Sequence, residues 1–447
     1  MGQKQITART AKGFRDFLPA TMHKRQYVFD IIQDIFHLYG FEPLQTPILE
    51  NHETLYGKYG EDAENLIFNA QHGRSNKEPL AMRYDLTVPL ARVVAQYENE
   101  LNFPFKRYQI APVFRGERPQ RGRYREFYQC DADIVGSSTM DADAELISMM
   151  IAVFKRLGFP EFSIKINNRK LLTGMGIYSG VSDTLLPELY RSIDKFDKIG
   201  ADGVRSELTE RGIPEAAIEK MMMLVTAHYP GVENLQYVLE IVKEIPIAVE
   251  GVQELMDMDR FMSATGLSTD YYAFDFTMVR GLGYYTGPIF ETQILNPNLG
   301  SISGGGRYDN LIGMFRKETL PTTGTSFGIE RIIDLMDELD LYPAHLSATQ
   351  VDAFVTVFAR DTHMESIAFA SKLREKGIRT EIDLTGKKLA KQFSYADKKQ
   401  IPIVVIIGPE EIIKQEVRIK HLGTGEEIQI QEGEAIQQIQ SWLKSGS

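Results

Sequence analysis

The sequence predicts an α+β protein, in which an antiparallel sheet flanked by helices is interrupted by a helical insertion and followed by a small α/β domain. Three observations predict this fold. Residues 125–134, and Val113, Arg115 and Glu117 before them, alternate in side-chain character with the period of two that is typical of strands. Residues from about 170 to 260 carry apolar side chains at helical spacing. From Val351 onward, apolar runs alternate with helical patterns, which indicates a mostly parallel sheet.

The size and composition of the chain limit the class of protein. Its 447 residues suffice for two or three domains, and 43% hydrophobic and 25% charged residues exclude a disordered or collagen-like chain. The net charge of −11 does not exclude nucleic acid, because binding depends on local charge. A single cysteine, Cys130, excludes an intrachain disulfide and a cysteine-built zinc site. With no secretory signal and no membrane-spanning run, we expect a soluble, cytoplasmic protein without a membrane partner.

The N-terminal half begins with elements that the spacing of apolar residues defines. A helix is predicted over residues 22–39, which Gly40 ends before an extended stretch. A second helix is predicted over residues 141–157. The stretch between the two helices is rich in aromatic residues and arginine, and its alternating pattern favours antiparallel strands.

The remaining elements set the expected domain boundaries. Strand character returns over residues 271–306, and residues 325–339 change from strand to helix. We therefore expect a first domain over residues 1–345, which contains the helical insertion at about 170–260, and a second domain over residues 351–447.

Two segments of this acidic chain are locally basic. Residues 101–130 hold seven Lys or Arg and two acidic residues, and residues 371–400 hold nine and four, so each has a net charge of +5. Both segments are therefore candidate sites for a polyanion such as a nucleotide or a nucleic acid.

Residues 125–134, taken as a strand, divide into an apolar face that suits a core and a polar face. The polar face carries Arg125, Phe127, Gln129, Asp131 and Asp133. Two interpretations are open. A charged face is often simply solvated; alternatively, the arginines hold a polyanion and the carboxylates an amine-bearing ligand. Three further segments with arginine, glycine or carboxylates favour the second interpretation, namely Met82–Thr87, Arg280–Tyr285 and Ser301–Asp309.

Common nucleotide- and metal-binding motifs are absent from the sequence. It contains no P-loop, and the glycines of residues 281–287 are spaced one residue too widely for the dinucleotide fingerprint. The eight histidines form no zinc motif and no recognisable catalytic triad. We therefore expect no metal site built from a protein motif and no prosthetic group.

Several blocks of the chain resemble the motifs of class II aminoacyl-tRNA synthetases. Gly40–Glu50 with Pro47 is similar to motif 1, Phe114–Gln120 with Arg123–Phe127 to motif 2, and Gly328–Arg331 to motif 3. The block Arg280–Tyr285, which continues to Glu291, resembles the histidine-specific signature of the histidyl-tRNA synthetase family. The resemblance extends over essentially the whole chain. It implies a class II catalytic domain over residues 1–345, an anticodon-binding domain over residues 351–447 and, through motif 1, a homodimer.

The resemblance also implies a function. A histidine–tRNA ligase joins histidine and ATP into histidyl-adenylate and transfers the histidyl group to the 3′ end of tRNA(His), and ATP enters with Mg²⁺ as a substrate complex. The implied ATP-binding residues are Arg115, Glu117, Phe127 and Arg331. The implied histidine-binding residues are Asp85, Leu86, Thr87, Arg115, Gln129, Asp133, Arg280, Tyr284, Tyr285 and Tyr308, with Arg280 and Arg115 as catalytic residues.

One position departs from the family pattern, because Gly283 stands where the signature usually has Asp. Two other functions remain open. A synthetase-like regulatory subunit of histidine biosynthesis, without charging activity, is opposed by residues 351–447 and by the intact Arg115 and Arg331. A synthetase for another amino acid, such as threonine, proline or glycine, is opposed by the block Arg280–Tyr285.

Overall fold

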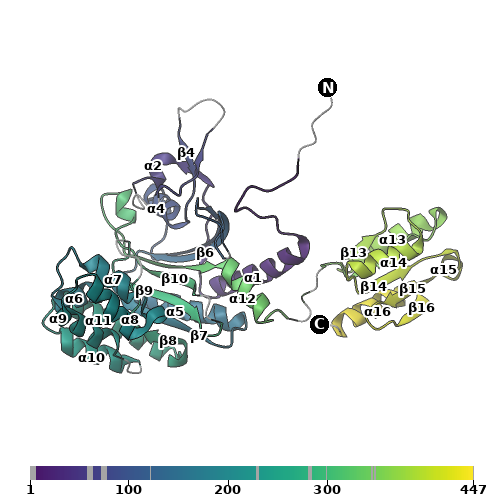
Figure 1. The fold of residues 1–447 in the computed structure, drawn as a ribbon. Coiled ribbons are helices and arrows are strands. Elements are labelled where there is room, and N and C mark those ends of the chain that lie inside the picture. Colours follow the sequence, from purple (N-terminus) through teal and green to yellow (C-terminus); the bar gives the residue numbers. More distant parts are fainter. Residues whose placement is uncertain are drawn as a thin grey trace. The chain divides into compact units, whose positions relative to one another are not determined.

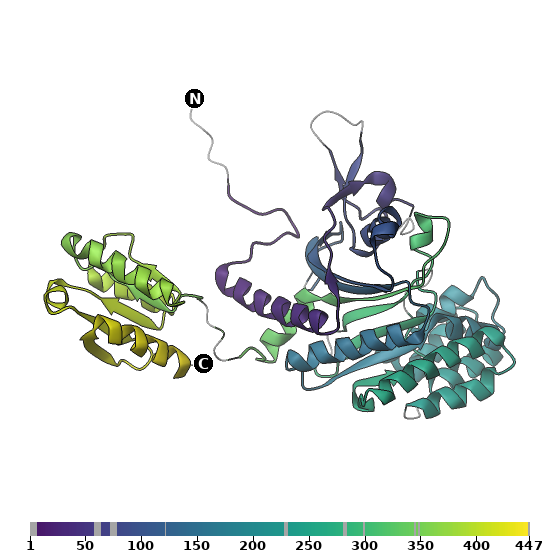
Figure 2. The ribbon, with the colours of Figure 1, turned by 180° about the vertical axis from the view of Figure 1, so that it is seen from behind.

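The computed structural model describes residues 7–57, 64–71, 78–120, 122–227, 231–279, 284–297, 300–343, 346 and 349–445. The chain divides into two compact units, Met1–Asp16 with Val28–Leu341, and Phe17–Tyr27 with Tyr342–Ser447. Figures 1 and 2 show their helices and strands from opposite sides. Among the described residues, no helix combines the length and hydropathy that crossing a lipid bilayer requires.

The larger unit is built on an eight-stranded sheet with the strand order β1-β5-β6-β11-β10-β9-β7-β8. The strands are β1 (Glu42–Pro43), β5 (Phe105–Phe114), β6 (Glu126–Val135), β7 (Phe162–Asn168), β8 (Tyr272–Phe274), β9 (Pro288–Ile294), β10 (Ser301–Arg307) and β11 (Thr322–Gly328). Neighbouring strands are antiparallel except at the two edges, where β1 pairs with β5 and β7 with β8 in parallel. The predicted antiparallel sheet is confirmed.

One face of this sheet packs against helices α1 (Pro19–Leu38) and α5 (Met140–Arg156). Phe36 of α1 and Phe154 of α5 both contact Phe327 of β11, with ring centroids 6.0 and 5.7 Å apart. Both predicted helices are confirmed, although α1 begins at Pro19 rather than at residue 22. Gly40 ends α1 with a φ of +74°, which glycine adopts without strain.

A smaller antiparallel sheet, in the order β2-β4-β3, precedes β5 in the chain. It consists of β2 (Leu49–Asn51), β3 (Asn69–Ala70) and β4 (Leu80–Met82), with the helices α2 (His52–Leu55) and α4 (Thr87–Gln96) adjoining it in sequence. Helix α12 (Ile329–Glu338) follows β11 directly. This is the change from strand to helix that the sequence predicts for residues 325–339.

The helical insertion lies beside β7 and β9 of the large sheet (Figure 1). Its helices are α6 (Arg169–Ser179), α7 (Leu186–Ile193), α8 (Phe196–Glu210), α9 (Glu215–Val225), α10 (Val232–Val242) and α11 (Pro246–Ala264). Helices α6 and α11 pack closely, because a Cβ on Gly174 would lie only 2.3 Å from Ala248 Cβ. The predicted insertion is therefore a compact helical layer.

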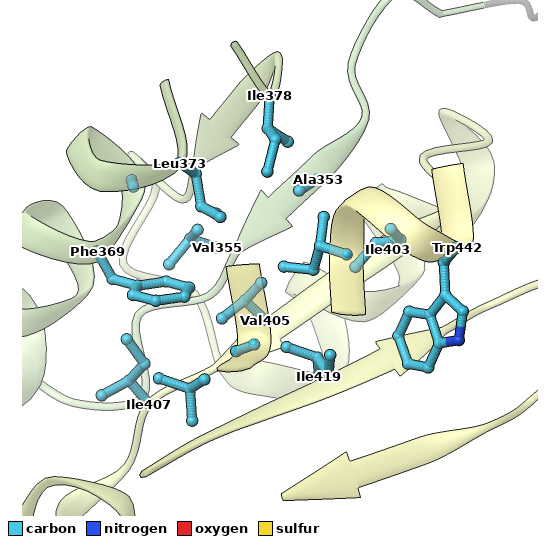
Figure 3. Close-up of a cluster of buried hydrophobic side chains, with 14 residues drawn as sticks. Ala353, Val355, Phe369, Leu373, Ile378, Ile403, Val405, Ile407, Ile419 and Trp442 are labelled. Carbon is cyan, nitrogen blue, oxygen red and sulfur yellow. The ribbon is translucent and has the colours of Figure 1, made fainter. Parts of the chain in front are cut away.

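The C-terminal domain has its own sheet, in the order β13-β12-β14-β15-β16. Its elements are β12 (Ala353–Val355), α13 (His363–Glu375), β13 (Thr380–Ile382), α14 (Leu389–Lys398), β14 (Ile403–Ile406), α15 (Pro409–Lys414), β15 (Glu416–His421), β16 (Glu427–Gln431) and α16 (Glu432–Ser445). Strands β13, β12 and β14 are parallel as predicted, but β15 and β16 add an antiparallel hairpin that the prediction missed. Figure 3 shows its core, where Phe369, Leu373 and Trp442 surround Val405 and Ile419.

Candidate active site

Three neighbouring strands form the floor of the candidate site. On β6, Gln129, Asp131 and Asp133 share one face because side chains alternate along a strand. The strand register places Arg107 of β5 and Gly324 of β11 directly opposite Asp133, one on each side. The next two β11 residues on this face are also small: Ser326 and Gly328.

The inner part of this polar face is buried, whereas Arg125 and Phe127 are half-buried. Gln129, Asp131 and Asp133 are 9%, 2% and 3% exposed. A buried carboxylate needs partners, because removing its charge from water is costly. The interpretation of this face as a solvated one is therefore wrong, and the structure shows a built polar site instead.

A cavity of about 370 Å³ lies along β6, β10 and β11 and at the start of α12. All four residues that the resemblance implies for ATP line it: Arg115, Glu117, Phe127 and Arg331. They come from segments more than 200 residues apart in the chain, and the register of β6 beside β11 brings those segments together. Gln129 also lines the cavity.

Arg115 and Phe127 form one wall of this cavity. The guanidinium carbon of Arg115 lies 5.0 Å from the ring centroid of Phe127 and 4.4 Å from that of Tyr84. Its Nε donates a hydrogen bond to the Tyr84 carbonyl oxygen (3.1 Å). Such contacts hold a guanidinium in place, and a fixed fork of N–H donors suits a phosphate or a carboxylate.

Arg331 and Glu117 line the cavity at other points. Arg331 Nη1 donates to the Ser301 carbonyl oxygen, and a Glu117 carboxylate oxygen lies 3.9 Å from Arg123 Nη1. Within the described ranges, no group of three or more His, Cys, Asp or Glu could hold a metal ion.

Gln129 connects the cavity with a second, buried polar region. Its Nε2 donates to Ser326 Oγ (3.0 Å) and to Asp131 Oδ1 (3.3 Å). Its Oε1 is buried and accepts no hydrogen bond from the described part of the chain. Because buried polar atoms are normally satisfied, this acceptor indicates a place where a ligand donor binds.

Asp133 is held from two sides within that region. Its Oδ1 accepts a hydrogen bond from the Tyr308 hydroxyl, and its Oδ2 lies 2.7 Å from Arg107 Nη2. Burial raises the pKa of Asp133, and the charge of Arg107 opposes that rise. Burial also raises the pKa of Asp131 to about 7, again against the charge of Arg107. The ionisation of both carboxyl groups thus depends on the neighbouring guanidinium.

The segment before α4 adds further polar groups. Asp85 Oδ1 accepts hydrogen bonds from the backbone N–H of Thr87 (3.1 Å) and of the following residue (3.0 Å), which satisfies donors at the start of the helix. Leu86 is fully buried, and its carbonyl oxygen accepts from Arg107 Nη2 (3.3 Å). Through Arg107, this segment is anchored beside Asp133.

Three tyrosines surround the same region. The ring centroid of Tyr284 lies 4.9 Å from that of Tyr285 and 5.4 Å from that of Tyr308. Burial raises the pKa of all three phenols, and the charge of Asp133 raises it further. The hydroxyl groups therefore stay protonated at neutral pH and remain hydrogen-bond donors.

Arg280 and Gly283 lie outside the described residues. On the described chain beyond them, Tyr284 belongs to the tyrosine group. The catalytic role of Arg280 and the effect of Gly283 stay predictions from the sequence.

The sequence analysis missed Arg107 and gave no role to Asp131 or Ser326. No signal in the sequence identifies Arg107, because its position opposite Asp133 depends on where the hairpin of β5 and β6 closes. The backbone N–H of Arg115 donates to Arg125 O (2.9 Å), and counting back along both strands from this closure brings Arg107 opposite Asp133. The sequence alone does not show where the hairpin closes, because the residues of the basic loop between the two strands do not indicate which residues form the first cross-strand pair.

Gly324 gives the first testable prediction. A Cβ at this position would lie 1.9 Å from Asp133 Oδ1 and 3.2 Å from the Tyr308 hydroxyl oxygen. Gly324→Ala should therefore displace the Asp133 carboxylate and raise the KM of the ligand that binds there by about tenfold or more, the scale of one lost charged hydrogen bond. Steady-state kinetics should show an unchanged KM for the ligand of the 370 Å³ cavity, and equal changes in both would contradict the prediction.

An antiparallel sheet whose arginines and phenylalanine line a nucleotide-sized cavity, followed by a separate α/β domain, defines a class II aminoacyl-tRNA synthetase. Comparisons with known proteins narrow this class. Residues 13–332 match the family model of histidyl-tRNA synthetase, and residues 352–442 match that of an anticodon binding domain. The chain belongs to the histidyl-tRNA synthetase family.

Individual relatives agree with this placement. The histidine–tRNA ligase of Phocaeicola vulgatus is 41% identical over 436 residues, 93% of this chain and 95% of that protein. The histidine–tRNA ligase of Bacteroides fragilis is 42% identical with the same coverage. The crystal structure of histidyl-tRNA synthetase from Nostoc sp. PCC 7120 covers 98% of this chain and 100% of its own, at 31% identity and a TM-score of 0.87. An ATP phosphoribosyltransferase regulatory subunit/histidyl-tRNA synthetase from Bacillus halodurans matches at 22% identity over 91% of this chain and 100% of its own, with a TM-score of 0.74, which shows a shared fold alone.

Proposed function

We propose that this chain is a histidine–tRNA ligase acting through the site described above. In the first step, a carboxylate oxygen of histidine attacks the α-phosphorus of ATP, a new P–O bond forms, and pyrophosphate leaves. In the second step, a ribose hydroxyl at the 3′ end of tRNA(His) attacks the carbonyl carbon of histidyl-adenylate, and AMP leaves.

The observation that carries the proposal is the position of Gln129. It lines the cavity that holds the implied ATP residues, and its amide donates to Asp131 of the buried polar region. A ligand that occupies both places has a nucleotide at one end and a small group with N–H donors at the other. Histidyl-adenylate has this composition.

In the proposed complex, the residues around the cavity bind ATP. Phe127 stacks on adenine, and Arg115 donates to the α-phosphate and to the carboxylate of the amino acid. Arg331 binds the nucleotide from the opposite side, and Glu117 positions adenine or the Mg²⁺ ion that enters with ATP. A fixed guanidinium near the α-phosphate stabilises negative charge that grows as the carboxylate attacks.

The buried polar region binds histidine in this proposal. Its amino group is held by Asp85, Thr87 and Gln129, with Leu86 lining the same segment, and Tyr308 is a wall of the pocket. Asp133, Tyr284 and Tyr285 surround the imidazole. An amino acid without ring N–H groups leaves these polar side chains unpaired, which disfavours its binding strongly.

Arg280 completes the proposed catalytic set. In this proposal its guanidinium, which precedes Gly281 and Gly283 in the sequence, stabilises charge on the α-phosphate in the transition state, together with Arg115. Both residues act on the activation step, since no new charge develops on the α-phosphate in the same direction during transfer to tRNA.

ATP–pyrophosphate exchange with the purified protein tests the proposal. Exchange that depends on histidine, and on none of the other amino acids, supports it. No exchange with any amino acid favours the regulatory subunit, and exchange with threonine, proline or glycine favours another synthetase. The family membership and the relatives named above favour the histidine enzyme.

The C-terminal domain would bind the anticodon stem of tRNA(His) through its basic segment. In this segment Lys372, Arg379 and Lys399 form ion pairs with acidic residues. Three exposed lysines at the start of α14 form no ion pair with the described residues, namely Lys387, Lys388 and Lys391. Free lysines on a helix end suit phosphate contacts, whose strength falls steeply with added salt.

Reversing these three charges is expected to weaken tRNA binding. The triple variant Lys387→Glu, Lys388→Glu and Lys391→Glu should raise the KM for tRNA by about tenfold or more, because each lost phosphate contact weakens binding. Histidine-dependent ATP–pyrophosphate exchange should stay unchanged. Lys420→Glu is the control, since Glu427 already neutralises Lys420 (2.9 Å). Normal aminoacylation by the triple variant at physiological salt would contradict the anticodon-binding role of this surface.

The motif 1 region supports the homodimer that belongs to the same proposal. Leu38, Ile48 and Leu49 are 76%, 44% and 44% exposed in the single chain. Ile48 and Leu49 border a groove of about 930 Å³ between the segment after β1 and strand β5. Large exposed apolar side chains beside a groove are typical of an interface between subunits.

We also propose a cytoplasmic location, in keeping with a single, fully buried cysteine.

A further inference from the structure

A fully buried arginine, Arg107, lies among the groups proposed to bind histidine. Its side chain is 0% exposed, its Nη2 lies 2.7 Å from Asp133 Oδ2, and the same nitrogen donates to Leu86 O (3.3 Å). Its Nε and Nη1 are buried and make no hydrogen bond within the described ranges. A buried guanidinium with unused donors is costly, so stability alone does not explain this residue.

We propose that Arg107 is a positioning residue for histidine specificity, which keeps Asp133 in its hydrogen-bond-accepting form and aims it at an imidazole N–H. This inference rests on the proposed function and extends it to a residue outside the implied binding set. The unused donors of Arg107 point to a second contribution, since they can hold a water molecule or a ligand acceptor in the same pocket.

The strand register fixes the geometry that the proposal needs. Arg107 and Asp133 are directly opposite on β5 and β6, a position where side chains contact each other. On the other side of Asp133, the missing side chain of Gly324 leaves room for the Tyr308 hydroxyl to reach Oδ1. Asp133 is therefore held between a hydroxyl that donates to Oδ1 and a guanidinium that pairs with Oδ2, and its carboxylate has little freedom to turn.

This arrangement selects what Asp133 can bind. Oδ1 accepts a hydrogen bond from Tyr308, whereas Oδ2, which lies 2.7 Å from Arg107 Nη2, accepts no hydrogen bond within the described ranges. Both oxygens therefore keep lone pairs for a further partner. A further group that binds the ionised Asp133 carboxylate must then donate a hydrogen bond, as an imidazole N–H does. A protonated Asp133 would itself carry a hydrogen and would lose this selectivity.

The surroundings of Asp133 otherwise favour the protonated form. The titratable groups that face it are Asp131 on its own strand, Arg107 on β5, Asp85 before α4, and the phenols of Tyr284, Tyr285 and Tyr308. Two of these are carboxylates, and burial acts in the same direction. Arg107 is the cation among them, so removing it should raise the pKa of Asp133 further.

Arg107→Met tests the proposal in the full-length chain. We expect the KM for histidine in ATP–pyrophosphate exchange to rise by about 10²-fold, with the KM for ATP changed by less than about threefold, because the lost contact belongs to a hydrogen-bonding specificity site. The defect should shrink as the pH rises from 6 to 9, since Asp133 then loses its proton without the help of Arg107. The unsubstituted protein should show no comparable change across this range.

Two further variants separate charge from geometry and from folding. Arg107→Lys keeps the charge but not the planar fork, so its pH profile should resemble that of the unsubstituted protein while its KM for histidine is intermediate. In the double variant Arg107→Met with Asp133→Asn, the buried charge is gone. Its thermal stability should recover relative to Arg107→Met, but the KM for histidine should stay high at every pH.

A matched pair elsewhere in the same sheet serves as the control. Arg307 of β10 pairs with Asp143 of α5, and their side chains are 4% and 0% exposed, against 0% and 4% for Arg107 and Asp133. Arg307→Met should lower thermal stability without a pH-dependent change in the KM for histidine.

The outcomes distinguish the possible errors. If the unsubstituted protein shows no histidine-dependent exchange, both the proposed function and the role of Arg107 are overturned. If it shows exchange and Arg107→Met raises both KM values equally, or leaves the pH profile unchanged, Arg107 is a structural residue and the proposed function stands. If Arg107→Met does not fold, an Arg107→Lys protein with a normal KM for histidine overturns the proposal.

Discussion

Arg115→Ala is expected to slow the formation of histidyl-adenylate by about 10²- to 10³-fold, the loss typical of one fixed donor to developing negative charge. The guanidinium is held against Phe127 and Tyr84, and its Nε is bonded to the Tyr84 carbonyl oxygen. It is therefore oriented before the reaction and loses no freedom in the transition state. Single-turnover measurement of adenylate formation checks this expectation.

The comparison with Arg115→Lys tests the reason for the loss. A lysine keeps the charge but not the planar fork, so its rate should lie between those of the alanine variant and the unsubstituted protein. Transfer from preformed histidyl-adenylate to tRNA should change much less. An equal loss in both steps would show that Arg115 maintains the fold of the cavity instead of stabilising the transition state.

Asp133→Asn is expected to raise the KM for histidine by about 10²-fold or more, because the pocket then lacks the acceptor for an imidazole N–H. The Tyr308 hydroxyl and the Arg107 guanidinium would both lose a charged partner. The KM for ATP should stay nearly unchanged, since Asp133 does not line the cavity. Exchange kinetics at varied histidine and ATP concentrations measure both values.

Asp143→Asn is the matched control for this prediction. Asp143 is also buried and paired with an arginine, Arg307, but it lies on α5. It should lose stability in thermal unfolding, as a broken buried pair does, and keep its KM for histidine. An unchanged histidine dependence in Asp133→Asn would place the specificity carboxylate elsewhere, with Asp85 as the next candidate.

Much of the fold follows from local patterns of the sequence. The apolar spacing of residues 22–39 and 141–157 predicts α1 and α5, because a helix that covers a sheet must present an apolar stripe. The alternation in residues 125–134 predicts β6. The prediction missed the hairpin of β15 and β16. Its strand β16 alternates polar and half-buried side chains and lacks the apolar run that identified β14.

The sequence by itself determined the class of fold, the family motifs and four residues that line the 370 Å³ cavity, because these depend on residue type and order along the chain. The tertiary structure decided which polar residues became a site. It brought Gly324 and Arg107 to opposite sides of Asp133, and it buried Gln129, Asp131 and Asp133, for which the strand pattern alone allowed either a solvated face or a binding site. The physical reason is that strand register is set by pairing between distant parts of the chain. The residues next to a charged side chain in the sequence therefore do not determine its partner across the sheet, and so they do not determine its ionisation.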